Sequence, residues 1–147
     1  MGIIDQLWEI YSREETWHRY KEPKESIDRY HERLLANGNI ITVSEGDFLL
    51  GYVEVWKISF EQLGRIVAGE RFSAYHEDVQ TGQIGWVANT YIRPEYRMGN
   101  VYKILKKRFF EITESCTHYS GHAVRKSAWM IKMFKKENIM SFKKVEA

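Results

Sequence analysis

The chain has 147 residues, of which 44% are hydrophobic, 14% aromatic and 29% charged, and its net charge is +2. This length and composition are typical of one compact domain over residues 1–147, and they exclude intrinsic disorder and a second core. No apolar run approaches the roughly 20 residues of a membrane helix, and early acids at Asp5 and Glu9 replace the basic start of a signal peptide, so we expect no membrane partner and a cytoplasmic location.

Two amphipathic helices are predicted first. Apolar residues recur at spacings of three and four over residues 3–20 and again from about residue 26 to 35, which places them on one side of a helix in each segment. Pro23 separates the two helices. The Asn-Gly-Asn sequence of residues 37–39 ends the second, because these residues accept the backbone conformation of helix C-termini.

A β-hairpin and a further strand are predicted next. Residues 40–43 and 48–56 are rich in β-forming residues and flank a short turn that contains glycine, which indicates antiparallel pairing. Residues 57–83 contain three glycines and many polar residues, and they fit either a short helix with a loop or an irregular excursion between strands. A strand is predicted over 84–92, ended by Pro94.

The predicted C-terminal elements are a basic helix, a strand and a short helix. Apolar residues form one stripe over residues 99–113, whereas the cations of that segment lie largely off the stripe. A strand over 117–124 and a helix over 127–136 follow. The order of elements predicts an α+β, or mixed α/β, fold with one central sheet.

The charge is unevenly distributed. Residues 93–147 contain 13 Lys and Arg against 5 Asp and Glu, a balance of +8 that leaves −6 for residues 1–92. Such asymmetry indicates that the C-terminal part faces an anion: a phosphate-bearing cofactor, nucleic acid or an anionic surface. A solvated lysine-rich face is the alternative.

The connection from the strand at 84–92 to the basic helix is the predicted anion site. A proline and an Arg-x-Gly turn lead into the helix, so backbone N–H groups and the positive helix end meet at one place. A pyrophosphate would lie across these amides, with charge-assisted contacts from Arg97 and Lys103. An ordinary strand-to-helix corner is the alternative. The predicted amides are those of Met98, Gly99, Asn100, Val101, Tyr102 and Lys103.

The same segment resembles the signature of the GCN5-related N-acetyltransferases. Residues 92–97, Ile-Arg-Pro-Glu-Tyr-Arg, are similar to the approach to that family's Arg/Gln-x-x-Gly-x-Gly/Ala loop, and residues 50–56 are similar to its Gly-Tyr-Val strand. In the order of elements the resemblance runs from about residue 1 to 136, whereas the specific motif covers only 89–103. It implies a mostly antiparallel central sheet flanked by helices, with acetyl-CoA bound through its pyrophosphate.

The resemblance also implies roles for single residues. Backbone N–H groups near Tyr91 and Ile92 would polarise the acetyl carbonyl, and Ser127 takes the place of an Asn that opens the family's Asn-x-x-Ala-x-x-x-Tyr helix near the cofactor. Phe134 takes the place of the tyrosine that protonates the thiolate in many members, and phenylalanine has no proton to give.

The cofactor loop also departs from the family pattern. The glycine of this chain, Gly99, comes one residue before the family's first glycine position, which Asn100 occupies. Tyr102 takes the Gly/Ala position, where the family keeps a small residue.

Glu54 is the leading candidate for the general base. It lies in an otherwise apolar strand, where burial would raise its pKa toward neutrality, although a solvent-facing glutamate on an alternating strand is the commoner arrangement. His76 with Glu77 is a second candidate, and His118 with His122 is a third. The two histidines lack an identifiable third metal ligand, so we expect no metal, and the single cysteine excludes an intramolecular disulfide and a thiolate cluster. As a nucleophile that cysteine, Cys116, has only His118 nearby in sequence as a possible activator.

These observations predict an acetyl-CoA-dependent N-acetyltransferase that acts on a primary amine of a small molecule or protein. One alternative is an inactive module of the same fold that binds nucleic acid or a protein partner, and another is a relative that modifies nucleic acid. The basic C-terminal half and the many aromatic residues suit nucleic acid, but no recognised nucleic-acid motif accompanies them.

Overall fold

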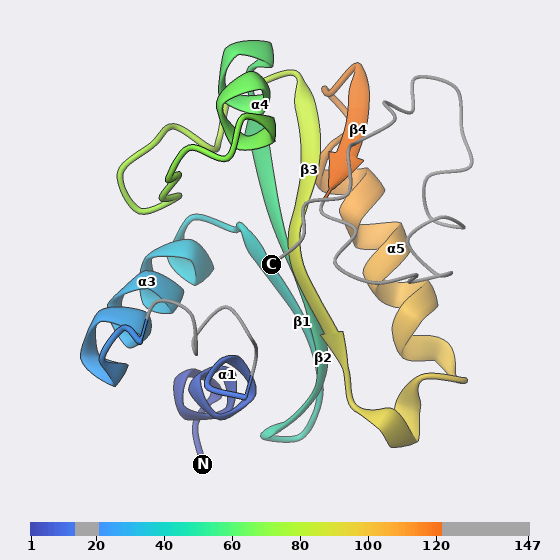
Figure 1. Ribbon diagram of the computed structural model, residues 1–147. Coiled ribbons are helices and arrows are strands. Elements are labelled where there is room, and N and C mark those ends of the chain that lie inside the picture. The colour runs from blue at the N-terminus through green and yellow to red at the C-terminus, as the bar shows by residue number, and fades with distance from the viewer. Residues whose placement is uncertain (14–20, 122–147) are drawn as a thin grey trace.

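The computed structural model describes residues 1–13 and 21–121. Within them lie a central sheet, four α-helices and one short 3₁₀ helix (Figure 1). In chain order the elements are α1 (Ile3–Tyr11), α3 (Lys24–Ala36), β1 (Ile40–Glu45), β2 (Phe48–Ile58), α4 (Phe60–Val67), β3 (Ile84–Ile92), η1 (Pro94–Tyr96), α5 (Asn100–Ile112) and β4 (His118–Gly121).

The sheet is mostly antiparallel, with the strand order β1-β2-β3-β4. β1 pairs with β2 and β2 with β3 in antiparallel register, whereas β4 runs parallel to β3. A parallel neighbour needs a crossover connection, and α5 supplies it. This arrangement confirms the predicted α+β fold, with a mostly antiparallel sheet flanked by helices.

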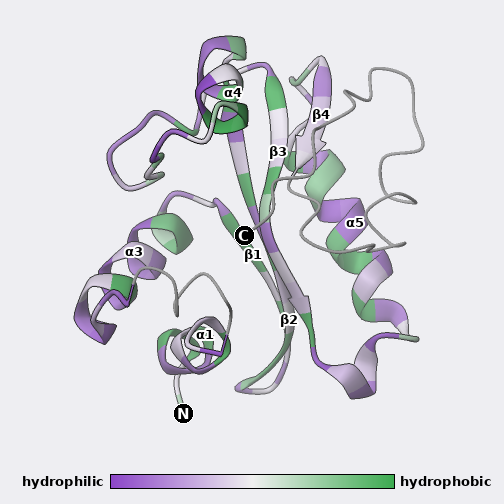
Figure 2. Cartoon of the chain, in the orientation of Figure 1, coloured by the Kyte–Doolittle hydropathy of each residue, from purple (hydrophilic) through white to green (hydrophobic). Residues whose placement is uncertain are grey.

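Helices cover both faces of the sheet. α1, α3 and α4 pack on one face and α5 packs on the other, as Figure 1 shows. Both layers are amphipathic, and Figure 2 shows hydrophilic residues on the outer sides of α3 and α5. The first core contains Leu7, Ile10, Leu34, Tyr52, Trp56, Leu63, Ile66 and Trp86, and the second contains Ile41, Val53, Val55, Val87, Val101, Leu105 and Phe109.

Most predicted elements are confirmed, and one boundary was wrong. The second helix ends where expected, because Gly38 adopts a φ of 76° after it. The first helix was predicted to reach residue 20 but ends at Tyr11, and residues 14–20 lie outside the described residues. The apolar spacing in the sequence continues past Tyr11, so it does not indicate where the helix ends. The predicted helix at 127–136 also lies outside the described residues, as does the end of the strand at 117–124.

The excursion between β2 and β3 begins with α4. Ser59 and Gln62 form a reciprocal capping box at its start, in which the Ser59 hydroxyl accepts from the Gln62 N–H and the Gln62 side chain accepts from the Ser59 N–H. The chain then returns to β2, where the Lys57 N–H donates to Val79 and the Gly82 N–H donates to Lys57. Of the two possibilities for residues 57–83, the helix with a loop is therefore the correct one. Within the described part of the chain, no helix is both long and apolar enough to span a membrane.

A buried histidine lies where α3 packs on α1. His31 is 1% exposed, its ring contacts Tyr11 and Tyr30 edge-on, and its Nδ1 has no hydrogen-bond partner among the described residues. Burial lowers the pKa of His31 to about 4, although the charge of Asp28 acts in the opposite direction. The folded state therefore resists protonation that the unfolded chain accepts near its ordinary pKa of 6.5.

We expect His31→Leu to reduce the acid sensitivity of folding. In the wild type the contribution of His31 to stability is complete above about pH 6.5 and is lost as the pH falls toward 4, by about 3 kcal/mol in total. Leucine has no such titration. Urea unfolding measures the stability of both proteins at pH 7 and at pH 4.5. Subtracting the change in the variant from the change in the wild type removes the contribution of the other titratable groups. Equal pH dependence in both proteins would contradict this account.

Candidate active site

A bulge divides β3 into two parts. The register between β2 and β3 shifts, so that Glu54 lies opposite Asn89 while Val55 lies opposite Val87, and Ala88 is the extra residue. β4 pairs with β3 only as far as Val87. From Ala88 onward, the edge of β3 that faces away from β2 pairs with no other described strand.

The register also decides which way the amides of β3 point. The Arg93 N–H donates to the Leu50 carbonyl at 2.9 Å, and successive residues of a strand point to opposite edges. The Tyr91 N–H therefore faces β2, whereas the Ile92 N–H faces the open edge. The Thr90 N–H, on the same edge, donates to Oδ1 of Asn89 at 2.9 Å. Of the two amides predicted near the acetyl carbonyl, Ile92 is the one that is directed outward.

The predicted anion site is the start of α5, where neither a capping side chain nor an acidic residue offsets the positive end of the helix dipole. Gly99 is the N-cap of α5, no side chain caps it, and the first turn contains no acidic residue. The N–H groups of such a turn have no acceptors within the helix and attract anions. The Gly99 amide is different, because it donates to Tyr96 at 3.2 Å. Asn100, Val101, Tyr102 and Lys103 form the first turn itself.

The side chains around this helix start differ in exposure. Met98 is fully exposed, whereas Val101 is buried and packs α5 against β2 at Gly51. Tyr102 is half-buried and Lys103 is exposed. Val101 therefore anchors the helix start on the sheet, while Met98 and Lys103 lie at the surface.

Two arginines follow β3, and they have different surroundings. Arg97 is exposed, and its Nε donates to the Ile92 carbonyl at 2.8 Å, which places the guanidinium at the end of the open edge. Arg93 instead contacts the hairpin, where its guanidinium lies 4.1 Å from the Phe48 ring centroid and donates to the Leu49 carbonyl. Of these two arginines, Arg97 is the predicted phosphate ligand, whereas Arg93 is bound to the hairpin.

Glu54 is buried and its ionisation is perturbed. It is 4% exposed, and the Tyr30 hydroxyl and the Trp56 Nε1 both donate to its Oε2, at 2.5 and 2.7 Å. Burial raises the pKa of Glu54 to about 7, although these two hydrogen bonds act in the opposite direction. The solvent-facing alternative is therefore wrong, because β2 is a central strand covered by helices on both faces.

The geometry gives the two carboxylate oxygens different roles. Both donors reach Oε2, and no described residue hydrogen-bonds Oε1. Burial and the nearby Glu54 hold the pKa of Tyr30 well above its ordinary value, so its hydroxyl stays protonated as a donor. Oε1 is then the carboxylate oxygen that has no hydrogen-bond donor among the described residues. A carboxylate whose pKa lies near neutrality is suited to general-base chemistry.

The second candidate for the general base is His76 with Glu77, and the ion pair that Glu77 forms does not suit proton acceptance. Glu77 is paired with Arg65 through two contacts of 3.0 Å, and this arginine lowers the pKa of the Glu77 carboxyl. His76 is exposed beside Tyr75.

The other candidates lie at the far end of β3 or are buried. His118 starts β4 opposite Ile84, away from the bulge, and contacts Phe60. Cys116 is buried, which raises its pKa and disfavours the nucleophilic thiolate. His122, Ser127 and Phe134 lie outside the described residues. No group of three metal-ligating side chains occurs within residues 1–13 and 21–121.

Sequence reasoning missed the partners of Glu54 and the bulge. In the sequence Tyr30 is one of the regularly spaced residues of the helix at 26–35 and Trp56 is the last residue of the strand at 48–56, and neither pattern indicates a hydrogen bond to Glu54. The spacing of Glu54 and Trp56, two residues apart on one strand, places both side chains on the same face and was the available indication. The Ala88 bulge left no comparable trace in the sequence.

A scan of protein families and a search of curated proteins find no match to this sequence. Solved structures do resemble the fold, three of them with a TM-score of 0.52. One is an aminoglycoside antibiotic 6'-N-acetyltransferase from Acinetobacter haemolyticus, 17% identical over 86% of this chain and 80% of that one. Another is an integron cassette protein from the mobile metagenome of Cole Harbour Salt Marsh, 15% identical over 98% and 85%. A third is a probable acetyltransferase, 14% identical over 100% and 91%. The chain therefore has the acetyltransferase fold that its resemblance to the GCN5-related N-acetyltransferases implies.

Proposed function

We propose that the protein is an acetyl-CoA-dependent N-acetyltransferase whose acceptor is a primary amine. The observation that carries this proposal is Glu54, a buried carboxylate with a pKa of about 7 that lies opposite Asn89, beside the β3 bulge. The acetyltransferases with the same fold support the assignment.

The residues present fit acetyl-CoA. The uncapped start of α5 carries no acid in its first turn, which suits a diphosphate, and Arg97 adds a cation next to it. From Ala88 to Ile92 the outer edge of β3 pairs with no described strand; its Thr90 N–H and Ile92 carbonyl have side-chain partners, and its Ile92 N–H is directed outward toward an extended ligand. Acetyl-CoA, when bound, supplies an acetyl group activated as a thioester.

The chain's own residues would carry out two tasks. The Ile92 N–H, directed at the open edge, would donate to the acetyl oxygen as negative charge develops there. Oε1 of Glu54 would take the proton that the acceptor ammonium or amine must lose, directly or through one water. The new N–C bond replaces the S–C bond, and the thiolate leaves with a proton from water or another acid.

Calorimetric titration tests the proposal. We expect heat on adding acetyl-CoA and much weaker binding of S-acetylpantetheine, which lacks the diphosphate. Release of free thiol should then follow on adding an amine, with an aminoglycoside, spermidine and a lysine peptide as first acceptors. An absence of heat and of any thermal shift at millimolar acetyl-CoA would refute the proposal. An oligonucleotide mobility shift that falls steeply with salt would favour nucleic-acid binding instead.

Arg97→Ala is expected to weaken acetyl-CoA binding by about 10-fold to 100-fold, the range for one charge-assisted hydrogen bond. Lys107→Ala is the matched control, since it removes an exposed cation from α5 beyond the first turn. Calorimetry of both variants gives the dissociation constants. Equal constants for the two variants would show that the phosphate site is elsewhere.

A further inference from the structure

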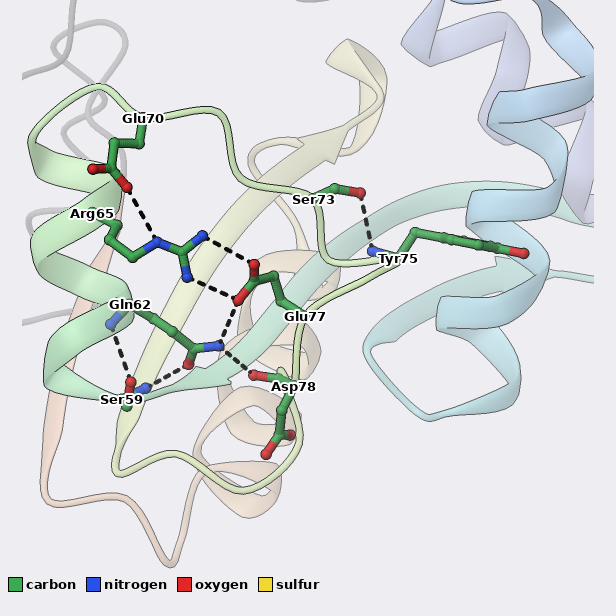
Figure 3. Close-up of polar contacts among 8 residues, drawn as sticks. All are labelled: Ser59, Gln62, Arg65, Glu70, Ser73, Tyr75, Glu77 and Asp78. Carbon is green, nitrogen blue, oxygen red and sulfur yellow. Dashed lines mark hydrogen bonds and ion pairs between the residues drawn. The ribbon is translucent and has the colours of Figure 1, made fainter.

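One arginine closes a loop within the excursion between β2 and β3. We call residues 70–77 the clamp loop. The Arg65 side chain contacts both of its ends, through Nε to Glu70 at 3.2 Å and through Nη1 and Nη2 to the two oxygens of Glu77 at 3.0 Å each (Figure 3). A bidentate pair fixes direction as well as distance, so Glu77 is the stronger of the two anchors.

The interior of the clamp loop packs against Trp56. The Phe72 ring lies 5.2 Å from the Trp56 ring, centroid to centroid, at an interplanar angle of 32°. The Arg65 guanidinium carbon lies 5.6 Å from the centroid of the Phe72 ring. Phe72 thus lies close to both the clamp arginine and the indole. The same indole donates its Nε1 to Oε2 of Glu54 at 2.7 Å.

The clamp loop also contacts the helix that supplies the second donor to Glu54. Tyr75 points toward α3 (Figure 3), and the Arg33 guanidinium carbon lies 4.6 Å from its ring centroid. Tyr30, on the same helix, donates to Glu54. Both donors to the carboxylate therefore belong to elements that the clamp loop contacts.

We propose that the clamp loop is a positioning element for Glu54, in which the Arg65–Glu77 pair holds Phe72 on Trp56 and Trp56 fixes Oε2 so that Oε1 is presented to the acceptor amine. The catalytic part of this inference rests on the proposed function. The structural part does not, because it states that the ionisation of Glu54 depends on Glu77.

The electrostatics around Glu54 give that dependence a direction. Tyr30 from α3 and Trp56 from β2 hydrogen-bond Glu54, Tyr52 lies two residues away on the same face of β2, and the clamp cation Arg65 is paired with Glu77. Hydrogen bonds from Tyr30 and Trp56 favour the ionised form against the effect of burial. Loosening Trp56 therefore raises the pKa of Glu54 further.

Carbon-13 NMR of the Glu54 carboxyl between pH 5 and pH 10, assigned with Glu54→Gln, tests the inference in the full chain. Trp56→Phe, which removes the donor, should raise the pKa of Glu54 by about one unit, the scale of one hydrogen bond to a charged group. Glu77→Gln should also raise the pKa of Glu54. Glu61→Gln is the matched control, since Glu61 is exposed on α4, and should leave it unchanged. Phe72→Leu provides a second route if Glu77→Gln lowers stability too far.

The outcomes separate this inference from the proposed function. If Trp56→Phe raises the pKa but Glu77→Gln and Phe72→Leu do not, the clamp loop is no positioning element and the inference is overturned. If the pKa of Glu54 and the acid limb of kcat/KM move together in Glu77→Gln, the inference holds. If the pKa of Glu54 rises in Glu77→Gln as expected but no amine is acetylated at any pH, the ionisation of Glu54 does depend on Glu77 and only the proposed function fails.

Discussion

Glu54→Gln is expected to lower kcat for acetyl transfer by about 100-fold to 10,000-fold, the usual contribution of a general base. Glutamine keeps the shape and can still accept from Tyr30 and Trp56, but it cannot take a proton at neutral pH. In the wild type kcat/KM should rise through about pH 7, because the base works only when it is deprotonated. The pH profile of the Glu54→Gln variant should lack this rise, the acid limb. Glu45→Gln, at an exposed position of β1, should keep wild-type rates and the same limb.

Glu54→Gln should also make the fold more stable than the wild type at alkaline pH. The pKa of Glu54 is raised above its unfolded value of 4.5, so its contribution to stability is complete below pH 4.5 and is lost as the pH rises through 7. The gain of the Gln variant over the wild type should grow by about 3 kcal/mol between pH 4.5 and pH 8. Urea unfolding at both pH values measures it. A variant that is inactive and also less stable at pH 8 would contradict the assignment, since the loss would then come from misfolding.

Gly82→Ala is expected to cost about 3 kcal/mol of folding stability, near the upper range for overpacking. A Cβ on Gly82 would lie 2.0 Å from the carbonyl carbon of Ile58, and a backbone atom cannot move aside as a flexible side chain can. The close approach arises because the excursion returns onto β2, where the Gly82 N–H donates to the Lys57 carbonyl at 3.1 Å.

Gly64→Ala is the matched control for that substitution. Gly64 lies within α4, and a Cβ there would meet nothing within 4 Å. Alanine should be neutral or stabilising at this position, by up to about 1 kcal/mol, because glycine weakens helices. Thermal melts of both variants should show a fall of about 6–12 °C for Gly82→Ala and none for Gly64→Ala. Equal melting temperatures would show that the excursion packs on β2 less closely than described.

Local sequence chemistry predicted most elements because each depends on neighbours in the chain. Gly38 and Pro94 stopped a helix and a strand through backbone constraints that need no tertiary partner. Over residues 57–83 the sequence does not distinguish a helix with a loop from an irregular excursion, because α4 has only eight residues, too few for periodicity to separate it from a loop. Its capping box, Ser59 with Gln62, was the local indication of a helix start.

The sequence by itself determined the elements, the sheet with its basic helix, and the turn at Arg97 and Gly99 that resembles a cofactor loop, since all of these follow from short-range patterns. Only the tertiary structure decided that Glu54 is buried and held through Oε2. Its donors come from α3 and from its own strand, and their meeting depends on the packing of α3 and the clamp loop on β2. Only the sheet register decided which amides of β3 face the open edge, because one extra residue at Ala88 changes the pairing with no mark in the composition.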